Sequence, residues 1–177
     1  MRSQHVDDFN HDDVADGYDL DVQDETNPIR TGYRATLDWV VKAGSLTGGS
    51  RVLELGSGTG NLTARIPVYK ELICVDVSAE MERIAQKRVG DWPDRSFVQD
   101  DVLGVFERGL GSFDAIISTY TIHHLEDDEK VHFFQKVWDS LSSNGRAVFG
   151  DLMLESRTCK ARKIQEYQEM GDDCTAA

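Results

Sequence analysis

The chain has 177 residues, 40% of them hydrophobic and 29% charged, which is enough apolar material for one domain with a core. Its formal net charge of −13 disfavours the phosphate backbone of a nucleic acid as a partner. The three cysteines form no C-x-x-C pair, and the histidines show no metal-motif spacing, so we expect neither disulfides nor a bound metal. No apolar stretch approaches the ~18 residues of a membrane span, and the N-terminus lacks a signal-peptide core, so we expect a cytoplasmic protein with no membrane partner.

Residues 1–27 are strongly acidic and show little periodicity. This composition is typical of a solvated arm, and a lid over a binding site is the functional alternative. We therefore divide the chain into an acidic N-terminal arm or lid (1–27), one folded domain (28–170) and a short tail (171–177). A helix is predicted to begin at Pro28, with Asn27 as its cap, and to end at Gly44.

The segment 51–60 reads RVLELGSGTG and organises the rest of the chain. Its apolar residues predict a buried strand of a parallel sheet over 52–55. The strand ends in glycines at alternate positions, which can adopt positive φ and let the backbone approach a ligand closely. A glycine turn between this strand and the short helix predicted for 61–66 is typical of a nucleotide cradle at the carboxyl end of a strand.

The spacing of the glycines distinguishes between possible ligands. A dinucleotide fingerprint is G-x-G-x-x-G, but Asn61 stands at the third glycine position and Gly60 comes one place early. Glu54 lies two residues before the first glycine, where a negative charge would oppose a pyrophosphate and suit a cation. A plain glycine turn without a ligand is the structural alternative.

The pattern E-x-G-x-G-x-G over residues 54–60 resembles motif I of the class I S-adenosylmethionine-dependent methyltransferases. The resemblance implies S-adenosyl-L-methionine as the cofactor and S-adenosyl-L-homocysteine as its product. This cofactor carries a positive sulfonium and a positive ammonium, and no phosphate. The resemblance also implies that the motif residues bind the cofactor, namely Glu54, Gly56, Ser57, Gly58 and Gly60.

A second likeness lies in the acidic arm. Residues 15–19 (ADGYD) resemble the A-x-x-Y-D segment that precedes the core in many small-molecule methyltransferases, which implies that Tyr18 approaches the methionine end of the cofactor. His11 departs from the pattern, which usually has an aromatic residue four positions before the alanine. The segment 24–33 (DETNPIRTGY) is similar to one in uncharacterised bacterial methyltransferases.

Residues 72–76 (LICVD) predict a second buried strand that ends in an acid. Asp76 follows the first glycine by ~20 residues, where an acid can accept hydrogen bonds from both ribose hydroxyls. NAD enzymes share this device, so Asp76 does not separate the two classes. Ser78 is predicted to cap the next helix. Val77 and Met81 could hold the adenine, and Met81 could equally belong to the helix core.

Residues 96–99 predict the third strand, and two acids follow it. Family members commonly have Gly-Asp here, with the aspartate taking the adenine amino group. The resemblance therefore implies this role for Asp101 and a place beside the adenine for Val102. Asp100 stands where the glycine is usual, so the choice between the two acids stays open. Both acids could instead cap a turn or a helix.

The string F-D-x-I…H-H-L, which begins in the fourth predicted strand (113–118), is similar to motif IV and the following segment of small-molecule methyltransferases, including the quinone-biosynthesis type. The likeness implies that Ser118 and Thr119 meet the methionine portion of the cofactor. It implies that Tyr120 and His123 face the methyl group and the acceptor. His123 is the candidate general base, with Tyr120 second, if the acceptor atom is oxygen or nitrogen.

A helix is predicted from Asp127, whose acidic first turn suits the helix dipole, to Asn144–Gly145. Strand five is predicted for 146–152, and a charged helix for 155–170. The helix that begins at Asp127 is expected to bury one apolar stripe, made of Val131, Phe134, Val137, Trp138 and Leu141.

Together these elements predict an α/β fold with a Rossmann-like, doubly wound, mainly parallel sheet in the order 3-2-1-4-5 and helices on both faces. The sixth and seventh strands usual in the family are missing from these predicted elements, and an uncovered fifth strand would favour a homodimer or a covering helix. We expect transfer of a methyl group from S-adenosylmethionine to a small-molecule acceptor of unidentified kind. A non-catalytic protein that binds S-adenosylmethionine or S-adenosylhomocysteine, and an NAD-dependent oxidoreductase, are the alternatives.

Overall fold

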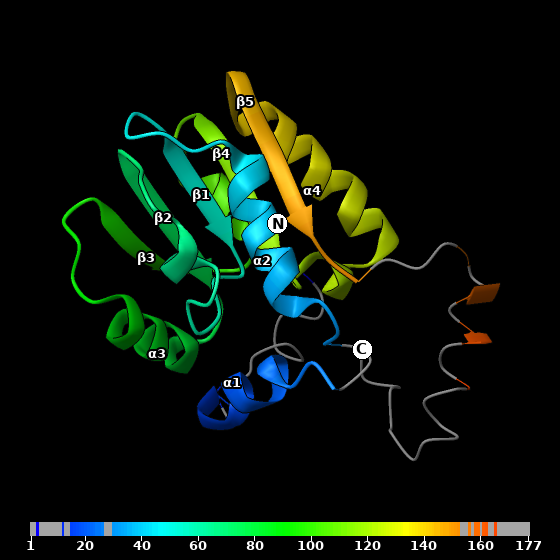
Figure 1. The fold of residues 1–177 in the computed structure, drawn as a ribbon. Coiled ribbons are helices and arrows are strands. Elements are labelled where there is room, and N and C mark those ends of the chain that lie inside the picture. The colour runs from blue at the N-terminus through cyan, green and yellow to red at the C-terminus, as the bar shows by residue number, and fades with distance from the viewer. Residues whose placement is uncertain are drawn as a thin grey trace.

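A computed structural model describes residues 3, 12, 15–26 and 30–152, with isolated positions between 156 and 165 and only the backbone of Asp16. Figure 1 shows a twisted sheet with helices packed on both of its faces. The predicted helix cap at Asn27–Pro28, most of the predicted helix 155–170 and the tail 171–177 lie outside the described residues. Within the part of the chain that is described, no helix is long and apolar enough to cross a membrane.

The strands form a single sheet in the order β3-β2-β1-β4-β5 (Figure 1). Their bounds are β1 Arg51–Leu55, β2 Glu71–Asp76, β3 Arg95–Gln99, β4 Phe113–Thr119 and β5 Leu141–Gly150. Every neighbouring pair is parallel, which confirms the predicted fold class and strand order. The order reverses between β1 and β4, and the crevice at the carboxyl ends of such strands is the usual ligand site of a doubly wound sheet.

The helices cover both faces of the sheet. Their bounds are α1 Ala15–Gln23, α2 Tyr33–Gly44, α3 Ala79–Val89 and α4 Asp127–Ser140, with 3-10 turns η2 Thr63–Arg65, η3 Gly104–Arg108 and η4 Ile122–His124. Successive side chains of a strand point to opposite faces. Val52 of β1 therefore packs in one core cluster with Leu37 of α2, while the next residue, Leu53, packs in the other with Phe133 of α4.

Two of the predicted helices are shorter in the structure. The helix expected from Pro28 begins at Tyr33, because Gly32 before it has a φ of 81°, in the left-handed region that a right-handed helix cannot include. The helix expected over 61–66 is a single 3-10 turn, Thr63–Arg65. The N-terminal arm contains α1, a helix that the weak periodicity of this segment did not predict.

The fifth strand begins earlier than predicted. α4 ends at Ser140, and β5 starts at the next residue, so Asn144–Gly145 lies inside the strand and not at a helix end. The register between β4 and β5 shifts between Phe113 and Ala115, and such an irregularity accommodates turn-prone residues within a strand. A Cβ on Gly145 would lie 2.7 Å from the carbonyl oxygen of Phe113, so glycine is required where the strand is irregular.

The buried stripe predicted for α4 was largely wrong. Val131, Phe134 and Trp138 are 73%, 48% and 75% exposed, whereas Phe133 and Val137 are buried against the sheet. Apolar residues at helical spacing occupy two adjoining faces of this helix, and periodicity alone does not say which face meets the sheet. α4 therefore presents an outer apolar face, formed by Val131, Phe134 and Trp138, to the solvent.

Candidate cofactor and acceptor site

The turn after β1 adopts backbone conformations that favour glycine. Gly56, Gly58 and Gly60 have φ values of 68°, 52° and 80°. A Cβ on Gly56 would lie 2.0 Å from Thr121 Oγ1, so this turn packs directly on the segment after β4. A Cβ on Gly58 would have no neighbour within 4 Å, which leaves one side of the turn open to a ligand.

Asp76 stands at the end of β2, beside this turn. Its Oδ2 accepts a hydrogen bond from the backbone N–H of Gly58 at 2.7 Å, and its Oδ1 accepts one from the N–H of Ser78 at 3.0 Å. The N–H of Ser57 donates to the carbonyl oxygen of Val75 at 2.9 Å. The ends of β1 and β2 are thus joined into one surface.

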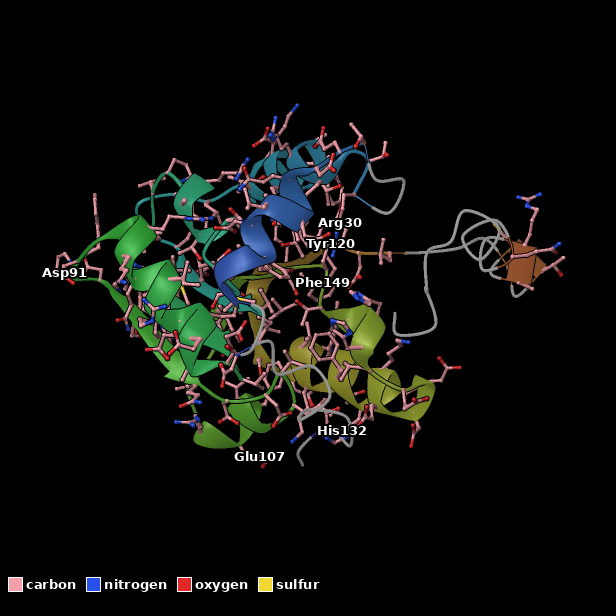
Figure 2. The ribbon with its side chains drawn as sticks, turned by 90° about the horizontal axis from the view of Figure 1, so that it is seen from below. Arg30, Asp91, Glu107, Tyr120, His132 and Phe149 are labelled. Atoms are coloured by element: carbon pink, nitrogen blue, oxygen red, sulfur yellow. The ribbon has the colours of Figure 1, made fainter. Side chains whose placement is uncertain are left out.

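A small recess of about 30 Å³ opens above the glycine turn. Six of the predicted site residues line it: Tyr18, Gly56, Ser57, Gly58, Thr119 and Tyr120. The other lining residues were not predicted; they are Tyr33, Thr59, Asn61 and Leu62. The ring centroids of Tyr33 and Tyr120 lie 5.2 Å apart. Figure 2 views the molecule with α1 in front and labels Tyr120. Three tyrosines from separate segments therefore converge on the end of the glycine turn.

A wider, open hollow lies elsewhere, along the end of α3 and the start of β3, and includes Asp91, Trp92 and Phe97. Figure 2 shows Asp91 at the edge of the molecule, well apart from Tyr120. None of the predicted site residues lines this hollow. We therefore take the smaller recess at the carboxyl ends of the strands as the candidate site.

Glu54 lies beneath the turn and does not line the recess. Its side chain is 1% exposed, and its Oε2 accepts hydrogen bonds from Thr63 Oγ1 at 2.8 Å and from Cys74 Sγ at 3.5 Å. Burial raises the pKa of the Glu54 carboxyl to about 7. Its other oxygen, Oε1, is buried without a hydrogen-bond partner among the described residues, and so is the hydroxyl of Ser57.

The two acids after β3 already have partners in the protein. Asp101 is buried, and its Oδ1 accepts hydrogen bonds from the N–H groups of Leu103 and Gly104 at 2.9 and 3.1 Å. Asp100 Oδ2 accepts a hydrogen bond from Arg108 Nε at 2.5 Å. The structure thus shows the capping role that the sequence allowed for Asp101. Neither acid lines the recess, and Val102 beside them packs against the core.

The remaining predicted cofactor residues differ in position. Ser118 is buried, and its hydroxyl donates to the carbonyl oxygen of Leu55 at 2.7 Å, which ties β4 to β1. Met81 is 2% exposed, as expected for a helix-core residue. The carbonyl oxygen of Val77 accepts a hydrogen bond from Gln99 Nε2 at 3.1 Å. These side chains lie around the site and outside the lining of the recess.

α1 is tied to the glycine turn by Asp19. Asp19 Oδ1 accepts hydrogen bonds from Thr59 Oγ1 at 2.6 Å and from Asn61 Nδ2 at 2.9 Å, and Asp19 Oδ2 forms an ion pair with Arg88 of α3. The neighbouring Tyr18 is held in the recess, where burial raises the pKa of its phenol. Asp19 was expected only as one of the acids of the N-terminal arm, and its contact with the glycine turn was not predicted.

His123 lies on the turn that follows β4 and is paired with Asp151 at the end of β5. The distance from His123 Nδ1 to Asp151 Oδ1 is 2.6 Å. Asp151 Oδ2 also accepts hydrogen bonds from the backbone N–H groups of Thr121, Ile122 and His123, at 3.1, 2.6 and 3.3 Å. Burial alone would raise the pKa of Asp151, but these hydrogen bonds outweigh burial and hold the pKa below its usual value.

Comparison with known proteins gives the family. A family model described as "Methyltransferase domain" matches residues 52–145. An uncharacterised methyltransferase of Geobacillus sp. (strain WCH70) is 33% identical over 162 residues, which cover 89% of this chain and 72% of that protein. The chain belongs to the methyltransferase domain family. The resemblance to the class I S-adenosylmethionine-dependent methyltransferases is therefore confirmed, and an NAD-dependent oxidoreductase is not favoured.

Solved structures share the fold of this methyltransferase. DhpI, in a complex described as DhpI-SAM-HEP, superposes with a TM-score of 0.70 at 22% identity, over 92% of this chain and 73% of that one. The N-methyltransferase NodS from Bradyrhizobium japonicum WM9, in complex with S-adenosyl-L-homocysteine, gives a TM-score of 0.66 at 22% identity, over 87% of this chain and 78% of that one. These likenesses support the Rossmann-like architecture read from the strand order.

Proposed function

We propose that this methyltransferase moves a methyl group from S-adenosylmethionine to a small-molecule acceptor by in-line displacement, with S-adenosylhomocysteine as the product. The observation that carries the proposal is the joined surface of the glycine turn and Asp76, at the carboxyl ends of the strands where the strand order reverses between β1 and β4. The solved neighbours named above are described as complexes with S-adenosylmethionine and S-adenosylhomocysteine, which supports the choice of cofactor.

The cofactor would lie across the turn with its ribose on Asp76. The backbone of Gly56, Ser57, Gly58 and Gly60 forms the surface beneath the cofactor. Tyr18 and Thr119 line the recess and would contact its methionine portion, with Ser118 holding β4 beside β1. Val77, Met81, Asp100, Asp101 and Val102 would surround the adenine. For the adenine amino group we favour Asp101 over Asp100. The N–H groups of Leu103 and Gly104 bind Asp101 through Oδ1, whereas the carboxylate of Asp100 is paired with the positive side chain of Arg108.

Two buried atoms fit a positively charged ligand. Glu54 Oε1 and Ser57 Oγ lack hydrogen-bond partners among the described residues, and buried polar atoms normally have partners. A cation above the turn favours the ionised form of Glu54, whose pKa burial has raised to about 7. The Glu54 carboxylate and the Ser57 hydroxyl therefore suit the positive sulfonium and ammonium of S-adenosylmethionine better than they suit a phosphate.

The chemistry demands little beyond positioning. The sulfonium of the bound cofactor makes its methyl group electrophilic, so the protein has to align donor and acceptor and exclude water. Alignment of this kind supplies roughly 7–11 kcal/mol of a reaction barrier. Tyr120, which lines the recess, and His123, which follows it on the same turn, are the residues we place toward the acceptor. A recess bounded by three tyrosines suits a small molecule, and the net charge of −13 disfavours a nucleic acid.

The test separates an enzyme from a binding protein. Calorimetry with S-adenosylmethionine, S-adenosylhomocysteine and NAD should show binding of the first two only. A methyl-transfer screen against metabolite pools with labelled donor should then reveal a labelled acceptor. Binding of NAD alone would contradict the proposal. Tight binding without transfer to any pool would favour the non-catalytic alternative.

We also propose a homodimer through the open side of the sheet. Within the described part of the chain, β5 pairs only with β4, so its other edge carries backbone groups without strand partners. The outer apolar face of α4 lies on the helix that packs against β5. Light scattering across a concentration series tests this proposal, and a monomer at every concentration would reject it.

A further inference from the structure

The contacts of Asp151 give it two roles at once. One oxygen of its carboxylate binds the ring of His123, and the other accepts the N–H groups of three successive residues, Thr121 to His123. The side chain of Asp151 is only 8% exposed. A buried carboxylate with this many donors holds both the turn and the imidazole in one arrangement.

This arrangement determines which nitrogen of His123 carries the proton. The lowered pKa of Asp151 keeps the carboxylate ionised at neutral pH, and an ionised carboxylate can only accept hydrogen bonds. Nδ1 of His123 must therefore be the donor across the 2.6 Å contact. In a neutral imidazole the other nitrogen, Nε2, then has its lone pair free to take a proton.

The same turn is attached to the cofactor surface. Thr121, whose N–H binds Asp151, packs against Gly56 so closely that a Cβ on this glycine would overlap its side chain. Tyr120, one residue earlier, lines the recess and has a φ of 52°, which is uncommon for a tyrosine and marks a sharp change of direction after β4. His123 is therefore held in a defined position relative to the glycine turn.

We infer that the acceptor is a hydroxyl or an amine that loses a proton as it is methylated, with His123 as the base and Asp151 as its positioning residue. This inference rests on the proposed function. A thiolate or a carbanion is already nucleophilic and requires no base at the moment of transfer. Asp151 also holds the turn, but a buried carboxylate that orients an imidazole and stabilises its protonated form serves a step in which a proton is taken up.

The step balances without any further reactant. The acceptor oxygen or nitrogen forms a bond to the methyl carbon as the carbon–sulfur bond of the cofactor breaks, and the bonding electrons go to sulfur, which becomes a neutral thioether. The proton of the acceptor moves to Nε2 of His123. The resulting imidazolium lies beside the Asp151 carboxylate and afterwards releases the proton to water.

The tautomer of His123 can be tested without knowing the acceptor. The protein is labelled with ¹⁵N-histidine, and the His123 signals are assigned by their loss in His123→Gln. We expect a protonated Nδ1 and a bare Nε2 in the wild type. In Asp151→Asn the amide oxygen can still accept the backbone N–H groups, while the amide nitrogen donates to Nδ1, so the proton should move to Nε2. A wild type already protonated at Nε2 would overturn the inference.

The activity readout uses the labelled acceptor found by the metabolite screen. Asp151→Asn should lower kcat/KM by about 10²- to 10⁴-fold, the usual contribution of a general base, and leave the affinity for S-adenosylmethionine unchanged. Asp114→Asn is the matched control, because Asp114 also accepts a backbone N–H and a side-chain donor, at the opposite end of β4. It should leave the rate unchanged.

The outcomes distinguish this inference from the function on which it rests. Failure of the wild type to bind S-adenosylmethionine would reject the proposed function. Normal binding and transfer to a thiol or a carbon, or a rate unaffected in Asp151→Asn, would reject the base and leave the methyltransferase standing. Transfer to a hydroxyl or an amine, with the tautomer change in Asp151→Asn, would support both.

Discussion

The N–H of Gly58 donates a hydrogen bond to Oδ2 of Asp76 at 2.7 Å. This contact makes the second strand a direct support of the turn that follows the first. It also leaves the carboxylate of Asp76 at the edge of the open side of Gly58, where a Cβ would meet nothing within 4 Å. One side chain thus shapes the glycine turn, and it is the acid that we propose as the partner of the ribose hydroxyls.

Replacement of Asp76 by alanine should weaken cofactor binding. A hydrogen bond to a charged group contributes about 1.5–3 kcal/mol, so the loss of even one should raise the Kd for S-adenosylhomocysteine about 10- to 100-fold. Calorimetry measures the change, and circular dichroism checks that the fold is kept. Asp91→Ala, in the hollow at the end of α3 and apart from the recess, is the control and should bind normally. Equal affinity in both variants would remove Asp76 from the site.

Alanine at Gly56 should destabilise the protein more than alanine at Gly58. Both positions have left-handed φ values, which cost an ordinary residue about 1–2 kcal/mol. Only Gly56 adds a steric conflict, because its Cβ would lie 2.0 Å from Thr121 Oγ1. We therefore expect Gly58→Ala to lower the free energy of unfolding by about 1 kcal/mol and Gly56→Ala by clearly more. Urea denaturation followed by circular dichroism measures the free energy of unfolding of both variants. Equal decreases would contradict the close packing of Gly56 against Thr121.

Glu54 should make the free energy of unfolding depend on pH. Its pKa is about 7 when folded, against 4.5 for the model carboxyl, so the folded protein holds a proton that the unfolded chain releases. The protonated form favours folding, and this contribution is complete below pH 4.5 and is lost as the pH rises toward 7. Glu54→Gln should flatten this part of the profile, with a difference on the order of 3 kcal/mol at its largest. Asp128→Asn, at an exposed position of α4, is the control and should leave the pH dependence of the free energy of unfolding unchanged.

Cofactor binding should release a proton through the same residue. A positive ligand above the turn favours ionised Glu54, so binding of S-adenosylmethionine at pH 6 should expel a proton. Calorimetry in buffers of different ionisation enthalpy measures this release. If Glu54→Gln releases as many protons on binding as the wild type, the proton comes from another group.

Asp19→Ala should loosen α1 over the recess. Asp19 binds Thr59, Asn61 and Arg88, while Tyr18 beside it lines the recess. Loss of these contacts should speed dissociation of S-adenosylhomocysteine about tenfold, since each hydrogen bond contributes about 1 kcal/mol. Stopped-flow displacement measures the rate, with Asp128→Ala as the control. An unchanged rate would mean that α1 does not cover the bound ligand.

The sequence was most informative where local chemistry determines local structure. The glycines after β1 and the acid at the end of β2 lie at a spacing that a parallel sheet brings together, so their proximity could be predicted. Asp151 was missed because it meets His123 across 28 residues, through the pairing of β4 and β5. Such a contact depends on strand register and has no local signature. Tyr33 was missed for a related reason, since helical spacing marks it only as buried.

The exposure of Trp138 on α4 affects how the protein can be followed in solution. The chain has three tryptophans, and the other two, Trp39 and Trp92, are 56% and 59% exposed. Their indole rings already meet water in the folded state, so intrinsic fluorescence will report unfolding poorly. The same emission is well suited to detect a molecule that binds to α4, because removal of the Trp138 indole from water shifts its emission spectrum toward the blue.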